Sequence, residues 1–211
     1  SETVWRQADK YDVPRIAFIN KMDRVGADFW GTIQMMRDRL GARPVPVQIP
    51  IILGDYFHSI IDLVNLREII FVEECGRVGY ETQPIPDDWA QMVDENRVKM
   101  LEALADYDDE LLHRYLESHD LPAELIHGAI RKGTIAGKIT PVLCGSAYRN
   151  RGVELLLDAV VDFLPSPLDM PPVTGEDPRS TDAIQRAPSL EDPFSAVAFK
   201  IMSDPYVGKL T

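Results

Sequence analysis

Four consecutive residues, Asn20-Lys21-Met22-Asp23, place an amide, an ammonium and a carboxylate directly after an apolar run. The Asp23 carboxylate can accept two hydrogen bonds at once, which suits a ligand edge that presents a ring N–H beside an amino group. Guanine has such an edge, whereas adenine would leave the carboxylate unpaired. The Asn20 amide can bond the other edge of the ring and tie neighbouring loops together, and the stem of Lys21 can lie along the ring face. The segment therefore predicts a guanine-binding loop.

A second segment, Gly145-Ser146-Ala147, also follows an apolar run. A small residue at Ala147 can expose its backbone N–H to the guanine oxygen, and Ser146 can brace Asp23 or its loop. Taken alone, such a segment is more often a turn that starts a helix. Its pairing with the first segment favours a base-binding role for Ser146 and Ala147.

These two loops need a sheet that brings them together. Residues 15–19 and 139–144 are predicted to be fully buried strands of a parallel sheet, and ligands bind at the carboxyl ends of such strands. Helices are expected at residues 2–11, at 28–40 with Gly41 as its stop, and at 153–164. The pattern indicates an α/β fold.

The block between these strand–helix units has a different texture. Three strand-like runs at residues 45–53, 59–65 and 68–73 predict an antiparallel meander. Three helices are expected to follow, so the block is predicted to be an α+β insertion.

Capping residues mark the ends of the helices in this block. Asp87 or Asp88 is expected to cap the first helix, and Asp108 or Asp109 the second. Pro122 fits the first turn of the third helix, and Gly133 fits the position just past its end.

The chain has 211 residues, 45% of them hydrophobic, and a formal net charge of -12. Twelve acidic residues against three basic ones lie between Asp87 and Glu124, so this stretch carries -9 of the total. It predicts either a solvated helix face or a docking surface for a partner. The acidic balance excludes a protein that coats a phosphate backbone with its whole surface.

Cysteine and hydropathy patterns indicate the compartment. Cys75 and Cys144 cannot form a disulfide framework and are predicted to be free thiols in a reducing cytoplasm. No apolar run is long enough for a membrane span, so no membrane is expected as a partner. The four histidines have no metal-ligand spacing with one another or with the cysteines, and no metal site is predicted; they are His58, His113, His119 and His127.

The C-terminal part changes composition again. Residues 165–193 hold seven of the sixteen prolines and have no periodic apolar face, which predicts a linker.

Several segments together resemble the bacterial elongation factor G family, a family of translational GTPases. They are Ser1 to Ala8, Pro14 to Arg24, Ile135 to Ala147, Leu155 to Val160, Leu164 to Pro167 and Ala198 to Pro205. The resemblance implies a ribosomal translocase that binds GTP or GDP, with Asn20, Lys21, Asp23, Ser146 and Ala147 at the guanine. It also implies that the insertion contacts the ribosomal stalk protein.

The resemblance further implies a domain plan in which a P-loop GTPase-type parallel sheet is interrupted by the insertion. The plan has GTPase-domain parts at residues 1–42 and 139–164, the insertion at 43–138, the linker at 165–193, and the first strands of a β-barrel domain at 194–211.

The chain lacks the sequences that would bind the phosphates. A Gly-rich phosphate loop, the ligands of Mg²⁺ and a group that positions water are all absent from these residues. The partial matches at residues 133–138 and 23–26 have the wrong spacing or order and are predicted to be turns. We therefore expect a fragment with no catalytic residues that does not hydrolyse GTP alone.

Two other functions remain open from the residues. The chain could act as a protein-docking module through its acidic insertion, or belong to a related translational GTPase such as a ribosome-protection protein or a release-factor GTPase. In a truncated chain, the strand at residues 15–19 would be an unprotected sheet edge, which predicts self-association.

Overall fold

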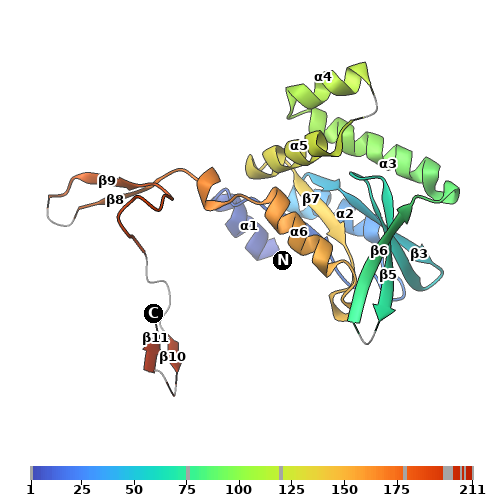
Figure 1. Ribbon diagram of the computed structural model, residues 1–211, viewed down its shortest axis with the longest axis horizontal. Helices are drawn as coiled ribbons and strands as arrows, with labels where there is room; N and C mark the ends of the chain where they lie inside the picture. The colour runs from blue at the N-terminus through green and yellow to red at the C-terminus, as the bar shows by residue number, and fades with distance from the viewer. Residues whose placement is uncertain are drawn as a thin grey trace. The chain divides into compact units, whose positions relative to one another are not determined.

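The computed structural model describes residues 2–74, 77–118, 121–177, 180–196, 202–204, 206 and 208–210. The chain divides into two compact units, Ser1–Leu164 and Pro165–Thr211. Within the first unit, a parallel sheet and an antiparallel sheet lie among the helices α1 to α6 (Figure 1). Cys75, predicted to be a free thiol, and His119, predicted to bind no metal, lie outside the described residues.

The parallel sheet has the strand order β1-β7-β2. The fully buried central strand β7 (Thr140–Cys144) pairs with β1 (Ala17–Ile19) on one side and with β2 (Pro44–Pro46) on the other. The pair Ile19 and Cys144 stands at the carboxyl ends of β1 and β7. The predicted strand at 15–19 is therefore present but shorter, and it is only partly buried because it forms an edge.

Helices α1 (Glu2–Lys10), α2 (Phe29–Leu40) and α6 (Val153–Phe163) lie where they were predicted. Helix α2 has both of its expected ends. The Asp28 carboxylate accepts a hydrogen bond from the Gly31 N–H at 2.8 Å, and Gly41 ends the helix with a φ of 61°, which favours glycine.

The antiparallel sheet has the sequential order β3-β4-β5-β6. Its strands are β3 (Gln48–Leu53), β4 (Tyr56–Asp62), β5 (Arg67–Glu74) and β6 (Arg77–Pro84). The meander is confirmed, with two corrections. The predicted run 45–53 is split, because residues 44–46 join the parallel sheet, and β6 was not predicted at all.

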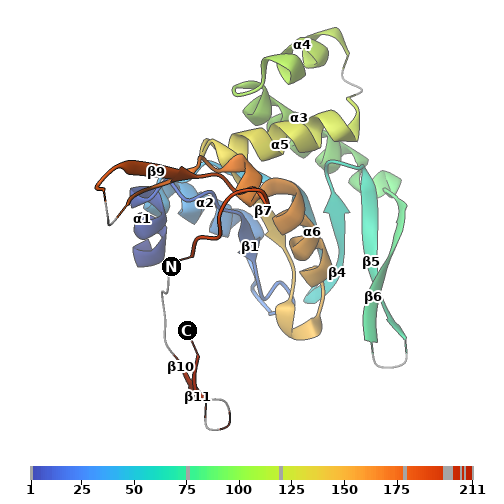
Figure 2. The same ribbon diagram turned by 60° about the vertical axis from the view of Figure 1, so that its left-hand side comes forward.

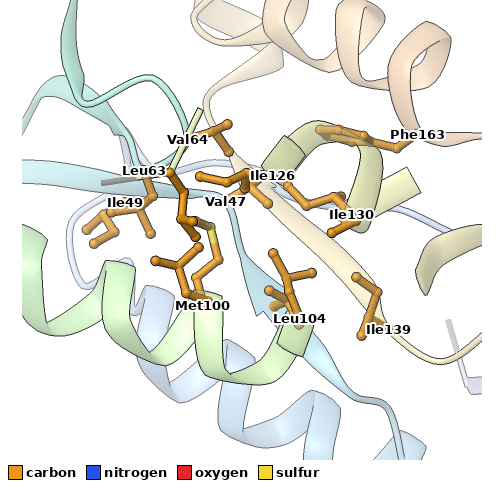
Figure 3. Close-up of a cluster of buried hydrophobic side chains, with 14 of the residues drawn as sticks. Val47, Ile49, Leu63, Val64, Met100, Leu104, Ile126, Ile130, Ile139 and Phe163 are labelled. Carbon is orange, nitrogen blue, oxygen red and sulfur yellow. The ribbon is translucent and has the colours of Figure 1, made fainter. Parts of the chain in front are cut away.

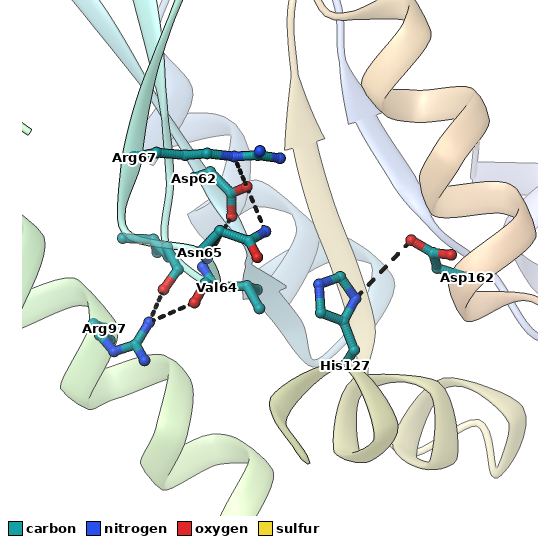
Figure 4. Close-up of polar contacts among 8 residues, drawn as sticks. Asp62, Val64, Asn65, Arg67, Arg97, His127 and Asp162 are labelled. Carbon is teal, nitrogen blue, oxygen red and sulfur yellow. Dashed lines mark hydrogen bonds and ion pairs between the residues drawn. The ribbon is translucent and has the colours of Figure 1, made fainter. Parts of the chain in front are cut away.

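Asp62 ends strand β4 earlier than the predicted 59–65. Its carboxylate accepts hydrogen bonds from the backbone N–H groups of Val64 and Asn65, from the Asn65 amide and from Arg67. These bonds close a tight turn in place of further strand pairing. The side chain of Arg97 supports the same turn by donating to the carbonyls of Leu63 and Val64 (Figure 4).

Helices α3 (Asp87–Ala105), α4 (Asp109–Glu117) and α5 (Ala123–Ile135) make up the rest of the block (Figure 2). The Asp108 cap of α4 is confirmed by its bond from the Leu111 N–H at 3.0 Å. The predicted Asp87 or Asp88 cap of α3 is wrong, because Pro86 is the N-cap and both acids lie in the first turn.

The predicted end of α5 at Gly133 is also wrong. Pro122 is the N-cap of this helix, and the helix continues through Gly133 to Ile135. A Cβ at Gly133 would come within 3.0 Å of the Ile139 side chain, so this glycine permits close packing against the chain that enters β7. Residues 133–135 are therefore helical, and the predicted turn is confined to the stretch around Gly137, whose φ is 65°. Residues 23–26 form turns as predicted.

Two buried clusters lie on opposite faces of the antiparallel sheet. One joins the sheet to α3, α5 and α6 (Figure 3), and the other joins it to α2, β1 and β7. On β4, Ile61 belongs to the first cluster and Ile60 to the second, because neighbouring residues of a strand point to opposite faces. Burying such a side chain contributes roughly 2 kcal/mol. The predicted insertion thus shares its core with the parallel strands.

The segment that the prolines predicted to be a linker contains two short paired strands. Strands β8 (Val173–Glu176) and β9 (Ala183–Arg186) form an antiparallel pair, after a short 3-10 turn at Pro167–Asp169. Strands β10 (Met202–Asp204) and β11 (Gly208–Leu210) form another pair. The prediction of a barrel start at 194–211 falls partly on residues that are not described, and the β10–β11 pair does not establish a barrel.

None of the helices in the described part of the chain is both long and apolar enough to cross a membrane.

Candidate functional site

The loop after β1 contains three of the predicted site residues. Asn20 follows the last residue of the strand, and its side-chain oxygen accepts hydrogen bonds from the N–H of Lys21 at 2.8 Å and from the N–H of Ala147 at 2.9 Å. The second bond joins loops that are 127 residues apart in sequence. Asn20 therefore ties the neighbouring loops together, as the sequence predicted.

Lys21 and Met22 direct the chain toward Asp23. Lys21 is exposed and has a φ of 66°, in the left-handed region that costs a residue other than glycine of order 1 kcal/mol. Met22 is only 2% exposed, and its N–H donates to the Gly145 carbonyl at 3.0 Å. The buried Met22 thus anchors the turn that aims the Asp23 carboxylate toward the second loop.

The loop after β7 is built around a close backbone approach at Gly145. Its N–H donates to the Ile19 carbonyl at 3.0 Å, so the two strand ends are joined in both directions. A Cβ at Gly145 would lie 2.3 Å from the Arg151 carbonyl oxygen and 2.7 Å from the Phe18 ring. Glycine is therefore required here by contact.

Ser146 is completely buried between the two loops. Its backbone N–H donates to the Arg151 carbonyl at 2.9 Å, and the Arg151 N–H donates back to the Ser146 carbonyl at 3.0 Å. Its hydroxyl oxygen, Oγ, is the one buried side-chain polar atom in the described part of the chain that has no partner within hydrogen-bonding geometry.

The environment of Asp23 favours its ionised form. The Ser146 hydroxyl lies beside Asp23, although outside strict hydrogen-bond geometry, and is the main cause that holds the pKa of this carboxyl below its ordinary value; burial works in the opposite direction. Smaller lowering effects come from the Asp23 backbone N–H, Arg24 and Arg149. The side chain is 18% exposed, and Arg149 lies 3.8 Å away. At neutral pH the group is an acceptor of hydrogen bonds only, as guanine recognition requires.

The structure brings all five predicted residues to one edge of the sheet, but it adds a contact that the sequence did not predict. The N–H of Ala147, expected to face the guanine oxygen, is bonded to Asn20 in this structure. A base bound as predicted would have to share this N–H or replace the Asn20 oxygen. The amide nitrogen of Asn20 is still available to the base in this arrangement.

A cavity of about 290 Å³ adjoins Asp23 on the side of the antiparallel sheet. This cavity was not predictable from the sequence, because it combines four segments with no shared motif. It is lined by Asp23, Asp55, Tyr56, Phe57, Glu73, Val78, Arg149 and Arg151. Arg149 and Arg151 lie two and four residues after Ala147. Their position in the same loop is the sequence signal that could have identified them as candidate functional residues.

Comparisons with known proteins identify the family of the chain. The sequence model of the family described as Elongation factor Tu GTP binding domain matches residues 1–166. A crystal structure of a protein from Thermus thermophilus is similar with a TM-score of 0.73 and 25% sequence identity. The match covers 99% of this chain and 28% of that chain, so this chain spans about 28% of the length of the solved protein. The chain belongs to the elongation factor Tu GTP-binding domain family and therefore to the translational GTPases.

Proposed function

We propose that this chain is the guanine-recognition half of the GTP site of an elongation factor G. The observation that carries the proposal is the position of Asp23 beside Ser146 at adjacent strand ends, with Asn20 bonded to Ala147 across the two loops. An ionised carboxylate facing a pair of N–H donors selects guanine over adenine. Lys21 supplies a flexible stem for the ring face.

The full activity requires parts that these 211 residues do not contain. Family membership implies GTP or GDP and usually Mg²⁺, and the residues present fit only the base. The phosphate loop and the Mg²⁺ ligands would belong to a longer protein, of which residues 1–42 and 139–164 form the GTPase-domain part, 43–138 the insertion, 165–193 the connection and 194–211 the start of a barrel domain. In that protein, GTP hydrolysis would drive translocation on the ribosome, in the cytoplasm.

The isolated chain is expected to be inactive as a GTPase and to bind nucleotide weakly, because backbone N–H groups and Mg²⁺ at the phosphates provide much of the attachment. Titration with a fluorescent GDP analogue measures this. We expect no saturation at low micromolar concentrations of the chain, and saturation in the longer protein. A dissociation constant of about 1 μM or tighter for the chain alone would contradict the proposed division of the site.

A second candidate function is docking of the ribosomal stalk protein through the acidic block. The observation that favours it is on α4, where Leu116 is 75% exposed and Leu112 is 38% exposed beside the acids Asp109, Glu110 and Glu117. Apolar residues inside a charged rim are typical of docking surfaces. A pull-down at low and high salt tests it, with Leu116→Ser as the variant. Equal retention of the variant, or no retention of the original chain at low salt, would remove support.

We also propose that the chain self-associates through β1. This strand is an edge of the parallel sheet, and in the segment that precedes it Val4 and Tyr11 are 68% and 69% exposed. Unpaired strand edges with apolar neighbours promote association. Light scattering at increasing concentration should give a rising mean mass, and a constant monomer mass at high concentration would disprove the proposal.

The sequence also left open two other classes of the same superfamily, ribosome-protection proteins and release-factor GTPases. The full sequence of the longer protein distinguishes them from elongation factor G.

A further inference from the structure

Arg151 joins the second base-binding loop to the antiparallel sheet. Its guanidinium donates to the Phe57 carbonyl at 2.6 Å and to the Tyr56 hydroxyl at 3.2 Å. The same group lies over the ring of Tyr56 at 5.3 Å and over the ring of Phe71 at 5.4 Å from the centroids. Charge-assisted hydrogen bonds and cation–π contacts on one side chain give a directional attachment to β4 and β5.

The backbone of Arg151 makes the other half of the connection. It exchanges hydrogen bonds of 2.9 and 3.0 Å with Ser146, so a displacement of Arg151 displaces Ser146. Ser146 in turn is the main cause of the lowered pKa of Asp23. A short path therefore runs from strand β4 through Arg151 and Ser146 to the predicted guanine-binding carboxylate of Asp23.

The residues on either side of Arg151 also hold this loop against the antiparallel sheet, because they pack closely or form a hydrogen bond there. A Cβ at Gly152, whose φ is 81°, would lie 2.6 Å from the Cys144 carbonyl oxygen and 3.2 Å from the Ile60 side chain. The Asn150 amide donates to the Val78 carbonyl at 3.5 Å. The loop is thus held between β7 and the antiparallel sheet, and a shift of the sheet has to move it.

We propose that Arg151 is a positioning residue for guanine recognition, which fixes the Ser146–Ala147 loop to strand β4 so that base affinity depends on the antiparallel sheet. This inference rests on the proposed guanine site. It assigns to the sheet a function in the site itself, in addition to its part in the core.

The test uses the longer protein with three variants. Arg151→Met removes the donors and the charge but keeps an apolar stem, Arg151→Lys keeps a charged donor, and Arg39→Met deletes an arginine that is exposed on α2 and makes no hydrogen bond or ion pair among the described residues. The readouts are the dissociation constants of GDP, of ADP and of inorganic pyrophosphate, which occupies a phosphate site without a base.

We expect Arg151→Met to weaken GDP about tenfold, since hydrogen bonds to charged groups are among the stronger ones. Pyrophosphate affinity should stay unchanged, Arg151→Lys should recover part of the GDP affinity, and Arg39→Met should match the original protein. Unchanged GDP affinity in Arg151→Met, or an equal loss for GDP and pyrophosphate, would overturn the positioning role. A protein that binds GDP and ADP equally before substitution would instead refute the guanine site itself.

Discussion

Asp23→Asn in the longer protein is expected to lower the affinity for GTP by about 100-fold or more and to raise the affinity for xanthosine triphosphate. The carboxylate accepts from both the ring N–H and the 2-amino group of guanine, whereas an amide has one acceptor and one donor. The amide nitrogen of the variant would face the 2-amino group, donor against donor. Xanthine carries a carbonyl at that position and restores the complementarity. Competition of each nucleotide against a fluorescent GDP analogue measures the two affinities.

A matched control variant distinguishes the loss of base recognition from the loss of a negative charge near the site. Asp55 is exposed, lines the cavity beside Asp23 and makes no hydrogen bond or ion pair among the described residues. Asp55→Asn removes the same charge, and the ratio of GTP to xanthosine triphosphate affinities should stay close to that of the original protein. Equal ratios in all three proteins would mean that Asp23 does not bind the base.

Gly145→Ala is expected to lower the free energy of unfolding by about 2–4 kcal/mol and to abolish guanine binding. The added Cβ would lie 2.3 Å from the Arg151 carbonyl oxygen, which cannot move freely because it accepts the Ser146 N–H. The other obstacle is the Phe18 ring at 2.7 Å, which belongs to β1. Relief of the Phe18 contact would move β1 and its loop away from the loop after β7, and relief of the Arg151 contact would displace Ser146. Urea denaturation of the chain measures the change in stability.

Gly128→Ala is the control for the same chemical change. Gly128 lies exposed inside α5, and a Cβ there would meet no atom within 4 Å among the described residues. Because alanine favours helix, this variant should gain up to about 1 kcal/mol. If Gly145→Ala unfolds at the same urea concentration as the original chain, the close approach at the strand end is not a constraint.

The elements that local signals specify were predictable. Helix α2 has an aspartate at one end and a left-handed glycine at the other, and both act through bonds to their own helix. The proximity of Asn20 and Ala147 followed from a general rule of parallel sheets, although the residues are far apart in sequence. The approach of these two loops at one edge of the sheet was therefore predictable.

The missed elements depend on contacts that have no local signal. Strand β6 is polar along much of its length and is held by pairing along all of β5. Gly133 is inside a helix because Ile139 packs against it, which overrides its tendency to end helices. The prolines of the second unit flank β8 and β9 and do not prevent their pairing. In each case contacts with other segments determined the secondary structure, and local propensity did not.

The site itself contained two surprises of the same origin. Asn20 was predicted to tie the loops together, but its partner was not: the Ala147 N–H, expected to face the base, donates to the Asn20 side chain. Arg151 and Tyr56 are 95 residues apart in sequence, and no sequence motif links them. Such pairings become visible only when the sheets are placed against each other.

A crystal structure of the longer protein with GDP would show whether Asp23 binds the base. We expect both Asp23 carboxylate oxygens within about 3 Å of the ring nitrogen and the 2-amino group of guanine. We also expect the Ala147 N–H to point at the guanine oxygen, with Asn20 displaced from it or sharing it. A base bound elsewhere, or an Asp23 carboxylate that makes no hydrogen bond to the base, would show that Asp23 does not recognise guanine.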